Sequence, residues 1–98
     1  MSLVHIMWEK MGVPRPYVDT DDTRTFENVN EADLVWHRDI EERVVTVLEG
    51  INWKLQIDNQ LPLTMKLGET YIIGKMVYHR LLKGKGRLIL KIKSNGKA

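Results

Sequence analysis

Two histidines and one aspartate are the residues of this sequence whose types and spacing best suit metal chemistry. His37 and Asp39 lie two positions apart, and His79 follows much later in the chain. If residues 36–39 form a strand, the His37 and Asp39 side chains point to the same face, with Cα atoms about 7 Å apart. Two imidazoles and one carboxylate hold Fe(II) with open coordination positions, and the same set suits Zn, Mn, Co or Ni. On spacing alone, however, such a His-x-Asp pair is more usually a surface hydrogen bond.

Short strands are the elements expected to position these residues. Alternating apolar and polar side chains, separated by turn residues such as Asn59 and Gly68, predict strands at 44–48, 53–57, 61–67, 71–73 and 87–93. No convincing helical period occurs after residue 33. Turn signals about every eight to twelve residues are typical of an all-β sandwich or barrel. We therefore expect an all-β fold whose strands place alternate residues toward the interior.

The first thirty residues interrupt this strand pattern. Residues 3–11 favour one short amphipathic helix, and residues 17–30 are interpreted as a loop with one strand near Thr25–Asn28. We therefore divide the chain into an N-terminal arm or edge strand at 1–30 and a barrel at 31–98. Because a small barrel leaves open strand edges, we expect the arm to lie across a second subunit or to add a strand to its sheet. The expected assembly is a homodimer.

Composition excludes several classes of protein. The 98 residues suit one domain, 43% of them are apolar, and the absence of cysteine excludes a disulfide scaffold, a thiolate zinc site and a cysteine nucleophile. No apolar run approaches the roughly 18–20 residues that span a bilayer, and no signal-peptide pattern opens the chain. We therefore expect a cytoplasmic protein without membrane contact. A net charge of +2, with no aromatic residues in a basic stripe, argues against nucleic-acid binding.

Charge is unevenly distributed along the chain. Residues 19–49 contain ten acidic and three basic residues, whereas residues 75–98 contain eight basic residues and no acidic one. The basic residues alternate with apolar ones, as on the solvated face of a strand. We therefore expect the two segments to lie near each other and offset their charges, rather than to form a basic face for an anionic partner.

A resemblance to a known family gives these residues a context. The segment from His37 to Ile92 resembles a small cupin domain. In the first cupin motif, a pair of metal-binding residues on a strand is followed by a glutamate and then by a strand that ends in glycine. His37 and Asp39 match the pair, with Asp39 at the place of the second histidine. The next strand ends in Val47-Leu48-Glu49-Gly50, which is very typical of cupins.

The second cupin motif begins at a glycine and ends at a histidine. Gly68 matches its first glycine and His79 its histidine at the full spacing, while Gly74 replaces the proline and Met76 the second glycine. The resemblance implies a cupin-type double-stranded β-helix, which is a jelly-roll barrel, preceded by the extended N-terminal arm. It also implies that the two histidines and the aspartate bind a divalent ion such as Fe, Mn, Ni or Zn.

The first motif departs from the cupin pattern at its glutamate, because Arg43 occupies that position. Glu42 is adjacent, but on a regular strand it faces the other way, and a one-residue bulge would be needed to make it a ligand. Arg43 is expected to point into the cavity, and two interpretations stay open. It grips the carboxylate of a substrate beside the metal, or it pairs with Asp39 in a cavity without metal.

Two further residues are candidates for substrate contacts. Gln56 faces inward if Trp53 and Leu55 face outward, and it then offers a polar group to the cavity. Tyr78 is adjacent to His79 and is within reach of a ligand, although an aromatic residue beside a cavity more often serves packing.

Three functions are consistent with these residues. The resemblance implies a mononuclear metalloenzyme, a dioxygenase or an isomerase, that acts on a small polar or carboxylate-bearing molecule, with the metal as Lewis acid or dioxygen template. The second is a metal-free degenerate cupin that binds a small ligand, and an Asp39–Arg43 bond would favour it. The third is a structural or partner-binding barrel, which a filled interior would favour. Cupins share a fold but differ widely in activity, so the resemblance does not select the reaction.

Overall fold

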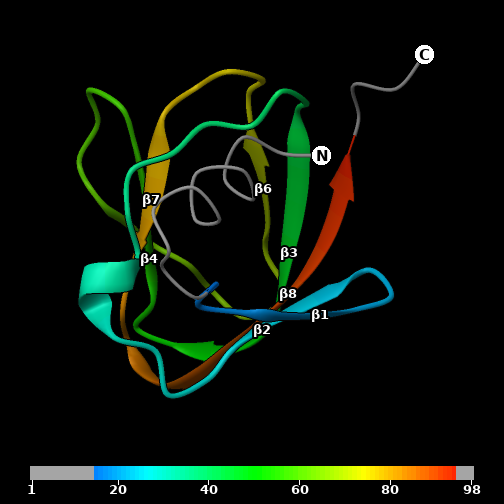
Figure 1. Ribbon diagram of the computed structural model, residues 1–98, viewed down its shortest axis with the longest axis vertical. Coiled ribbons are helices and arrows are strands. Elements are labelled where there is room, and N and C mark those ends of the chain that lie inside the picture. Colours follow the sequence, from blue (N-terminus) through cyan, green and yellow to red (C-terminus); the bar gives the residue numbers. More distant parts are fainter. Residues whose placement is uncertain (1–14, 95–98) are drawn as a thin grey trace.

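The computed structural model describes residues 15–94 and shows a chain built almost entirely of short strands. Two sheets face each other, with β4 and β7 on one side and β3, β6 and β8 on the other (Figure 1). A turn of 3-10 helix precedes β3 and is capped by Asn30, whose side chain accepts a hydrogen bond from the Ala32 amide. The elements are β1 Val18–Thr20, β2 Thr23–Phe26, η1 Glu31–Asp33, β3 Arg43–Ile51, β4 Lys54–Ile57, β5 Leu63–Thr64, β6 Thr70–Ile73, β7 His79–Leu82 and β8 Lys85–Ser94.

The larger sheet has five strands in the order β1-β2-β8-β3-β6, and the smaller has three in the order β5-β4-β7. All pairs are antiparallel. The chain changes sheet between β3 and β4 and again between β7 and β8, which is the behaviour of a jelly-roll sandwich. The all-β prediction is confirmed.

The core lies between the two sheets. On the larger sheet Val47 is opposite Leu90, and Val45 is opposite Ile92, so alternate residues of β3 and β8 face inward together. The largest fully buried side chains are Trp53, Leu88 and Val47. Burying each side chain of this size stabilises the fold by about 1.5–3 kcal/mol.

The segment before β3 contains two strands where the sequence predicted a loop with one. β1 and β2 form a tight hairpin in which Asp21 adopts a left-handed conformation with φ 55°. β2 then pairs with β8 of the same chain, so that Phe26 is opposite Leu88. Residues 18–26 are therefore part of the chain's own larger sheet. The helix predicted at 3–11 lies outside the described residues.

The smaller sheet also differs from the prediction in detail. β5 covers only Leu63–Thr64 of the strand predicted at 61–67, and β7 was missed. β7 contains a histidine and an arginine before its two leucines, so its sequence alone lacks the alternation that marks a strand. Its pairing with β4 stabilises it as a strand. No helix within residues 15–94 is long and apolar enough to cross a membrane.

The acidic and basic segments of the chain lie close together, as predicted. Arg87 of β8 forms a two-pronged ion pair with Glu49 of β3, with N–O distances of 2.7 and 3.2 Å. Lys91 of β8 approaches Asp22 at 3.8 Å. The sheet order places β8 between β2 and β3, and this position explains why the basic strand meets acidic neighbours on both sides.

Gly84 joins β7 to β8 where the chain passes against the end of β3. A Cβ atom at Gly84 would collide with the backbone of Ile51, Asn52 and Trp53. The glycine is therefore required by the close approach of two turns.

Candidate metal centre

His37, Asp39 and His79 are brought together by backbone pairing between two distant segments. The His37 amide donates to the His79 carbonyl at 3.0 Å, and the His79 amide donates to the His37 carbonyl at 2.9 Å. Two residues further on, the Met76 amide donates to the Asp39 carbonyl at 2.7 Å. The segment before β3 thus runs beside the start of β7, and the three side chains converge. We call these three residues the metal centre.

Both imidazoles are oriented by backbone carbonyls. The Nδ1 atom of His37 lies 2.8 Å from the Val35 carbonyl, and the Nδ1 atom of His79 lies 2.8 Å from the Val77 carbonyl. A carbonyl oxygen only accepts hydrogen bonds, so each Nδ1 carries the proton. In the neutral ring Nε2 then keeps its lone pair. This is the second-sphere arrangement that orients histidine ligands of metals.

The ligand atoms of the metal centre all lie within 4.8 Å of one another. His79 Nε2 is 3.5 Å from Asp39 Oδ2. That separation is close to the roughly 3 Å expected between neighbouring ligands that are each about 2.1 Å from an ion. Asp39 is 7% exposed and His79 is 4% exposed, so neither is in contact with bulk water. By donor type, orientation and spacing, the three side chains fit a divalent metal ion.

Burial keeps both histidines neutral. Burial lowers the pKa of His37 to about 4, and the neighbouring His79 lowers it further. Burial also lowers the pKa of His79, and the positive charge of Arg43 acts in the same direction. At neutral pH the Nε2 lone pair of His79 therefore faces a carboxylate oxygen, and both atoms are acceptors. A positive ion between them would convert this unfavourable contact into two bonds.

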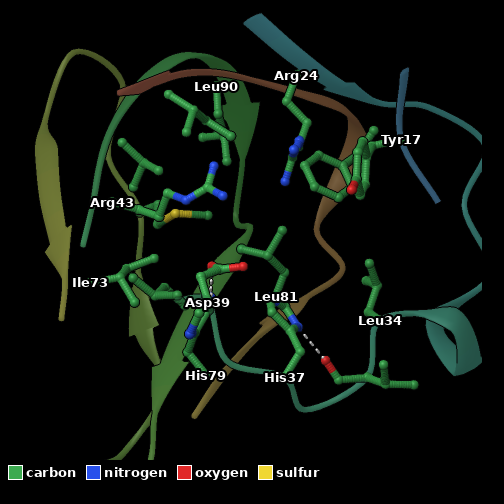
Figure 2. Close-up of a pocket in the computed structure, with 16 residues that line it drawn as sticks. Tyr17, Arg24, Leu34, His37, Asp39, Arg43, Ile73, His79, Leu81 and Leu90 are labelled. Atoms are coloured by element: carbon green, nitrogen blue, oxygen red, sulfur yellow. Dashed lines mark hydrogen bonds and ion pairs between the residues drawn. The ribbon is translucent and has the colours of Figure 1, made fainter. Parts of the chain in front are cut away.

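Arg43 begins β3 and points into the cavity between the sheets, as the alternation with Val45 predicts (Figure 2). Its Nε atom is buried and has no hydrogen-bond partner within residues 15–94. Over the same residues Arg43 and Asp39 form no ion pair, so the Asp39–Arg43 bond that would mark a disarmed site is absent.

Arg24 is a cavity residue that the sequence analysis missed. It lies on β2 opposite Leu90, and the pairing turns its side chain inward. Its guanidinium donates two hydrogen bonds to Asp19, at 2.8 and 3.1 Å, and stacks 3.8 Å from the Tyr17 ring centre. The available signal was its place two residues before Phe26. Had the strand been extended toward the N-terminus, alternation would have placed Arg24 on the buried face.

The cavity that joins these groups has a volume of about 60 Å³. Its walls are largely apolar, with Leu55 and Leu81 from the smaller sheet and Val45 and Leu90 from the larger. About 10–15 Å³ is enough for one water molecule, so the cavity has room for an ion and a few small ligand atoms. The barrel is therefore not filled, which argues against a purely structural scaffold.

Three other predicted site residues lie away from this cavity. Glu42 immediately precedes β3 and is not one of the residues whose ligand atoms cluster. Gln56 is opposite Arg80 on the outer face of the smaller sheet and accepts a hydrogen bond from Arg80 Nε at 2.9 Å. The assumption that Trp53 and Leu55 face outward is wrong, since both are buried, and Gln56 therefore faces the other way.

Tyr78 is likewise on the outside of the molecule. It is 40% exposed, and the Arg38 guanidinium lies 5.0 Å from its ring centre. Its neighbour His79 points inward, and alternation along the strand turns Tyr78 outward. The structure does not bring Tyr78 or Gln56 to the cavity.

No protein-family model and no curated protein matches the sequence. Solved structures do match. A candidate mannose-6-phosphate isomerase from Ralstonia eutropha JMP134 has a TM-score of 0.56 at 11% identity, covering 82% of this chain and 80% of its own. A cupin-2 domain containing protein from Shewanella frigidimarina NCIMB 400 has a TM-score of 0.55 at 24% identity, over 80% of this chain and 76% of its own. The chain has a cupin fold.

A Neisseria meningitidis protein also resembles this cupin, with a TM-score of 0.52 at 19% identity over 81% of this chain and 80% of its own. All of these identities are low, so the likeness concerns the cupin fold and not the roles of individual residues. The cupin resemblance drawn from the two sequence motifs is confirmed at the level of the fold.

Proposed function

We propose that this cupin-fold chain binds one divalent metal ion at the metal centre and uses it to bind, and to act on, a small polar or carboxylate-bearing molecule. The observation that carries the proposal is the contact between His79 Nε2 and Asp39 Oδ2 at 3.5 Å. With the His79 proton on Nδ1, both atoms are acceptors in a buried position. Such an arrangement is favourable when a cation lies between them.

The residues of the chain determine what this site does. His37, Asp39 and His79 provide two neutral ligands and one anionic ligand, so a bound divalent ion keeps positive charge and open positions for a substrate. When bound, the metal supplies Lewis acidity or a template for dioxygen. Arg43 lies on the opposite sheet and presents a guanidinium to an acidic group of the substrate. The apolar walls exclude water and strengthen these electrostatic contacts.

The reaction is proposed only as a class. A dioxygenase or an isomerase is consistent with a His/Asp/His centre beside a small cavity. One structural neighbour is described as a candidate mannose-6-phosphate isomerase, but at 11% identity this likeness supports the fold and not the substrate. The ligand is expected to be a small molecule, and the cytoplasmic location stays a prediction.

A second candidate is a ligand-binding module that holds no metal. The buried, unbonded Nε of Arg43 favours it, because a small carboxylate could occupy the cavity through arginine alone. Metal content separates the two candidates.

The test is elemental analysis of untagged protein, followed by calorimetric titration with Mn²⁺, Zn²⁺ or Fe²⁺. We expect about one metal per chain in the wild type and loss of that metal in the His37→Ala, His79→Ala double variant. His5→Ala, which changes the remaining histidine of the sequence, is the matched control and should keep the metal. Circular dichroism confirms that each variant folds. A wild type that takes up no metal even after reconstitution would contradict the proposal.

We further propose that the protein is a homodimer. The larger sheet has open edges at β1 and β6, and Ile72 of β6 is 66% exposed. Open edges and exposed apolar residues are commonly covered by a second copy. Size-exclusion chromatography with light scattering should give twice the 11.4 kDa chain mass. A monomeric mass at micromolar concentration would exclude the dimer.

A further inference from the structure

Two arginines from different strands reach the same end of the cavity. Arg24 comes from β2 and Arg43 from β3, and both line the inner cavity and also a shallow outer hollow beside it. Figure 2 shows both guanidinium groups pointing into the cavity on the side of Asp39 that is away from His37 and His79. The metal centre and the arginines therefore occupy opposite ends of one space.

Both arginines have hydrogen-bond donors to offer. Arg43 Nε is buried with no acceptor within residues 15–94. Arg24 is held in place by Asp19, which takes two of the five N–H donors of a guanidinium. A buried donor without an acceptor is unfavourable, and an anion at this position would satisfy it.

The balance of charge in the cavity also requires an anion. Asp19 offsets Arg24, whereas Arg43 forms no ion pair within the described part of the chain. Asp39 is the buried carboxylate at the metal centre, and it would neutralise only half of a divalent ion. With metal bound, the space would hold about two uncompensated positive charges in largely apolar surroundings.

We propose that the cavity is specific for a small dicarboxylate, with one carboxylate held by Arg43 and Arg24 and the other directed to the metal centre. The inference rests on the proposed function, because the second carboxylate needs the metal. A dianion supplies the two negative charges that the site lacks. A guanidinium binds a carboxylate through parallel hydrogen bonds, so the arginine end also orients the ligand.

The experiment compares ligands of equal length on Mn²⁺-loaded protein. Malonate and succinate are titrated calorimetrically beside propanoate and butyrate, the monocarboxylates with the same number of carbons. We expect at least one dicarboxylate to bind tenfold or more tightly than its monocarboxylate partner. Equal affinities would overturn the proposal.

Variants identify the residues responsible. Arg43→Gln and Arg24→Gln should each weaken dicarboxylate binding about tenfold or more, since each removes a charge-assisted hydrogen bond. Arg43→Met is the second variant, should the glutamine variant fold poorly. Arg87→Gln is the matched control, because it breaks an arginine–carboxylate pair of the same geometry on the outer surface. Its affinity should stay within twofold of the wild type. Wild-type affinity in Arg43→Gln would also overturn the proposal.

The same titrations separate this inference from the proposed function. Failure of Mn²⁺ to bind contradicts the metal centre. Retained Mn²⁺ binding with no effect of the arginine variants contradicts the dicarboxylate site alone. In metal-free protein we expect weaker carboxylate binding that Arg43→Gln abolishes, and no such binding would contradict the arginine end of the site.

Discussion

His37 and His79 exchange two backbone hydrogen bonds, at 3.0 and 2.9 Å, although the chain between them contains strands β3 to β6. Their rings meet edge to face with centres 4.3 Å apart. The pairing of two segments that are distant in sequence therefore creates the histidine pair of the metal centre. Each ring is then oriented by a carbonyl two residues before it. Four predictions follow from this geometry and from the packing around it.

Asp39→Asn should have opposite effects on the metal-free and metal-loaded protein. In the metal-free protein the amide donates to His79 Nε2 where two acceptors now face each other, so the free energy of unfolding should rise by about 1 kcal/mol. Metal affinity should fall at least about 100-fold, because the anionic ligand is lost. Urea unfolding with EDTA and with Mn²⁺ measures both effects. A metal-free variant less stable than the wild type would show that Asp39 and His79 do not face each other as acceptors.

Acidification should destabilise the metal-free protein. The pKa of His37 is lowered from 6.5 to about 4 in the folded state, and that of His79 is lowered as well. As pH falls through 6.5, the unfolded chain binds protons that the folded chain refuses until about pH 4, so stability is full above pH 6.5 and is lost over this range. The loss from His37 should reach about 3 kcal/mol near pH 4. Urea unfolding from pH 7.5 to 4.5 measures it, and His37→Gln should flatten the profile.

Arg43→Met should stabilise the metal-free protein while it impairs ligand binding. The substitution removes a buried Nε atom without an acceptor and keeps an apolar stem of similar length, so the free energy of unfolding should rise by about 1–2 kcal/mol. Arg80→Met is the matched control on the outer face. Arg80 donates to Gln56 and stacks over Trp36, so its removal should lower stability by about 0.5–1 kcal/mol. Thermal unfolding compares the two, and equal destabilisation would indicate that Arg43 has a buried acceptor.

Gly84→Ala should be more destabilising than Gly68→Ala. A Cβ at Gly84 would strike the backbone of Ile51 and its neighbours, which cannot move aside as a side chain can. We expect a cost of at least about 2 kcal/mol, by overpacking. Gly68 has φ 81° and open space around it, so alanine there should cost only about 1 kcal/mol of backbone strain. Denaturant unfolding of the two variants is the measurement, and equal costs would contradict the close approach of the two turns.

The sequence by itself determined the features that depend on local alternation and motif spacing. Alternation along β3 and β8 predicted which of their residues face the core, and it placed Arg43 toward the interior two residues before Val45. The spacing of the two cupin motifs brought His37, Asp39 and His79 into one proposed ligand set. These inferences succeeded because a strand has a period of two, so the direction of each side chain follows from its neighbours.

Only the tertiary structure decided which strands pair and what therefore faces the cavity. β7 has no strand pattern of its own and exists through its pairing with β4, and Arg24 enters the cavity because β2 pairs with β8. Gln56 and Tyr78 were predicted to face inward, but the burial of Leu55 and His79 turns them out. A shift of one residue in register reverses every side chain of a strand, and long-range packing selects that register. The local sequence carries no information about its distant partner.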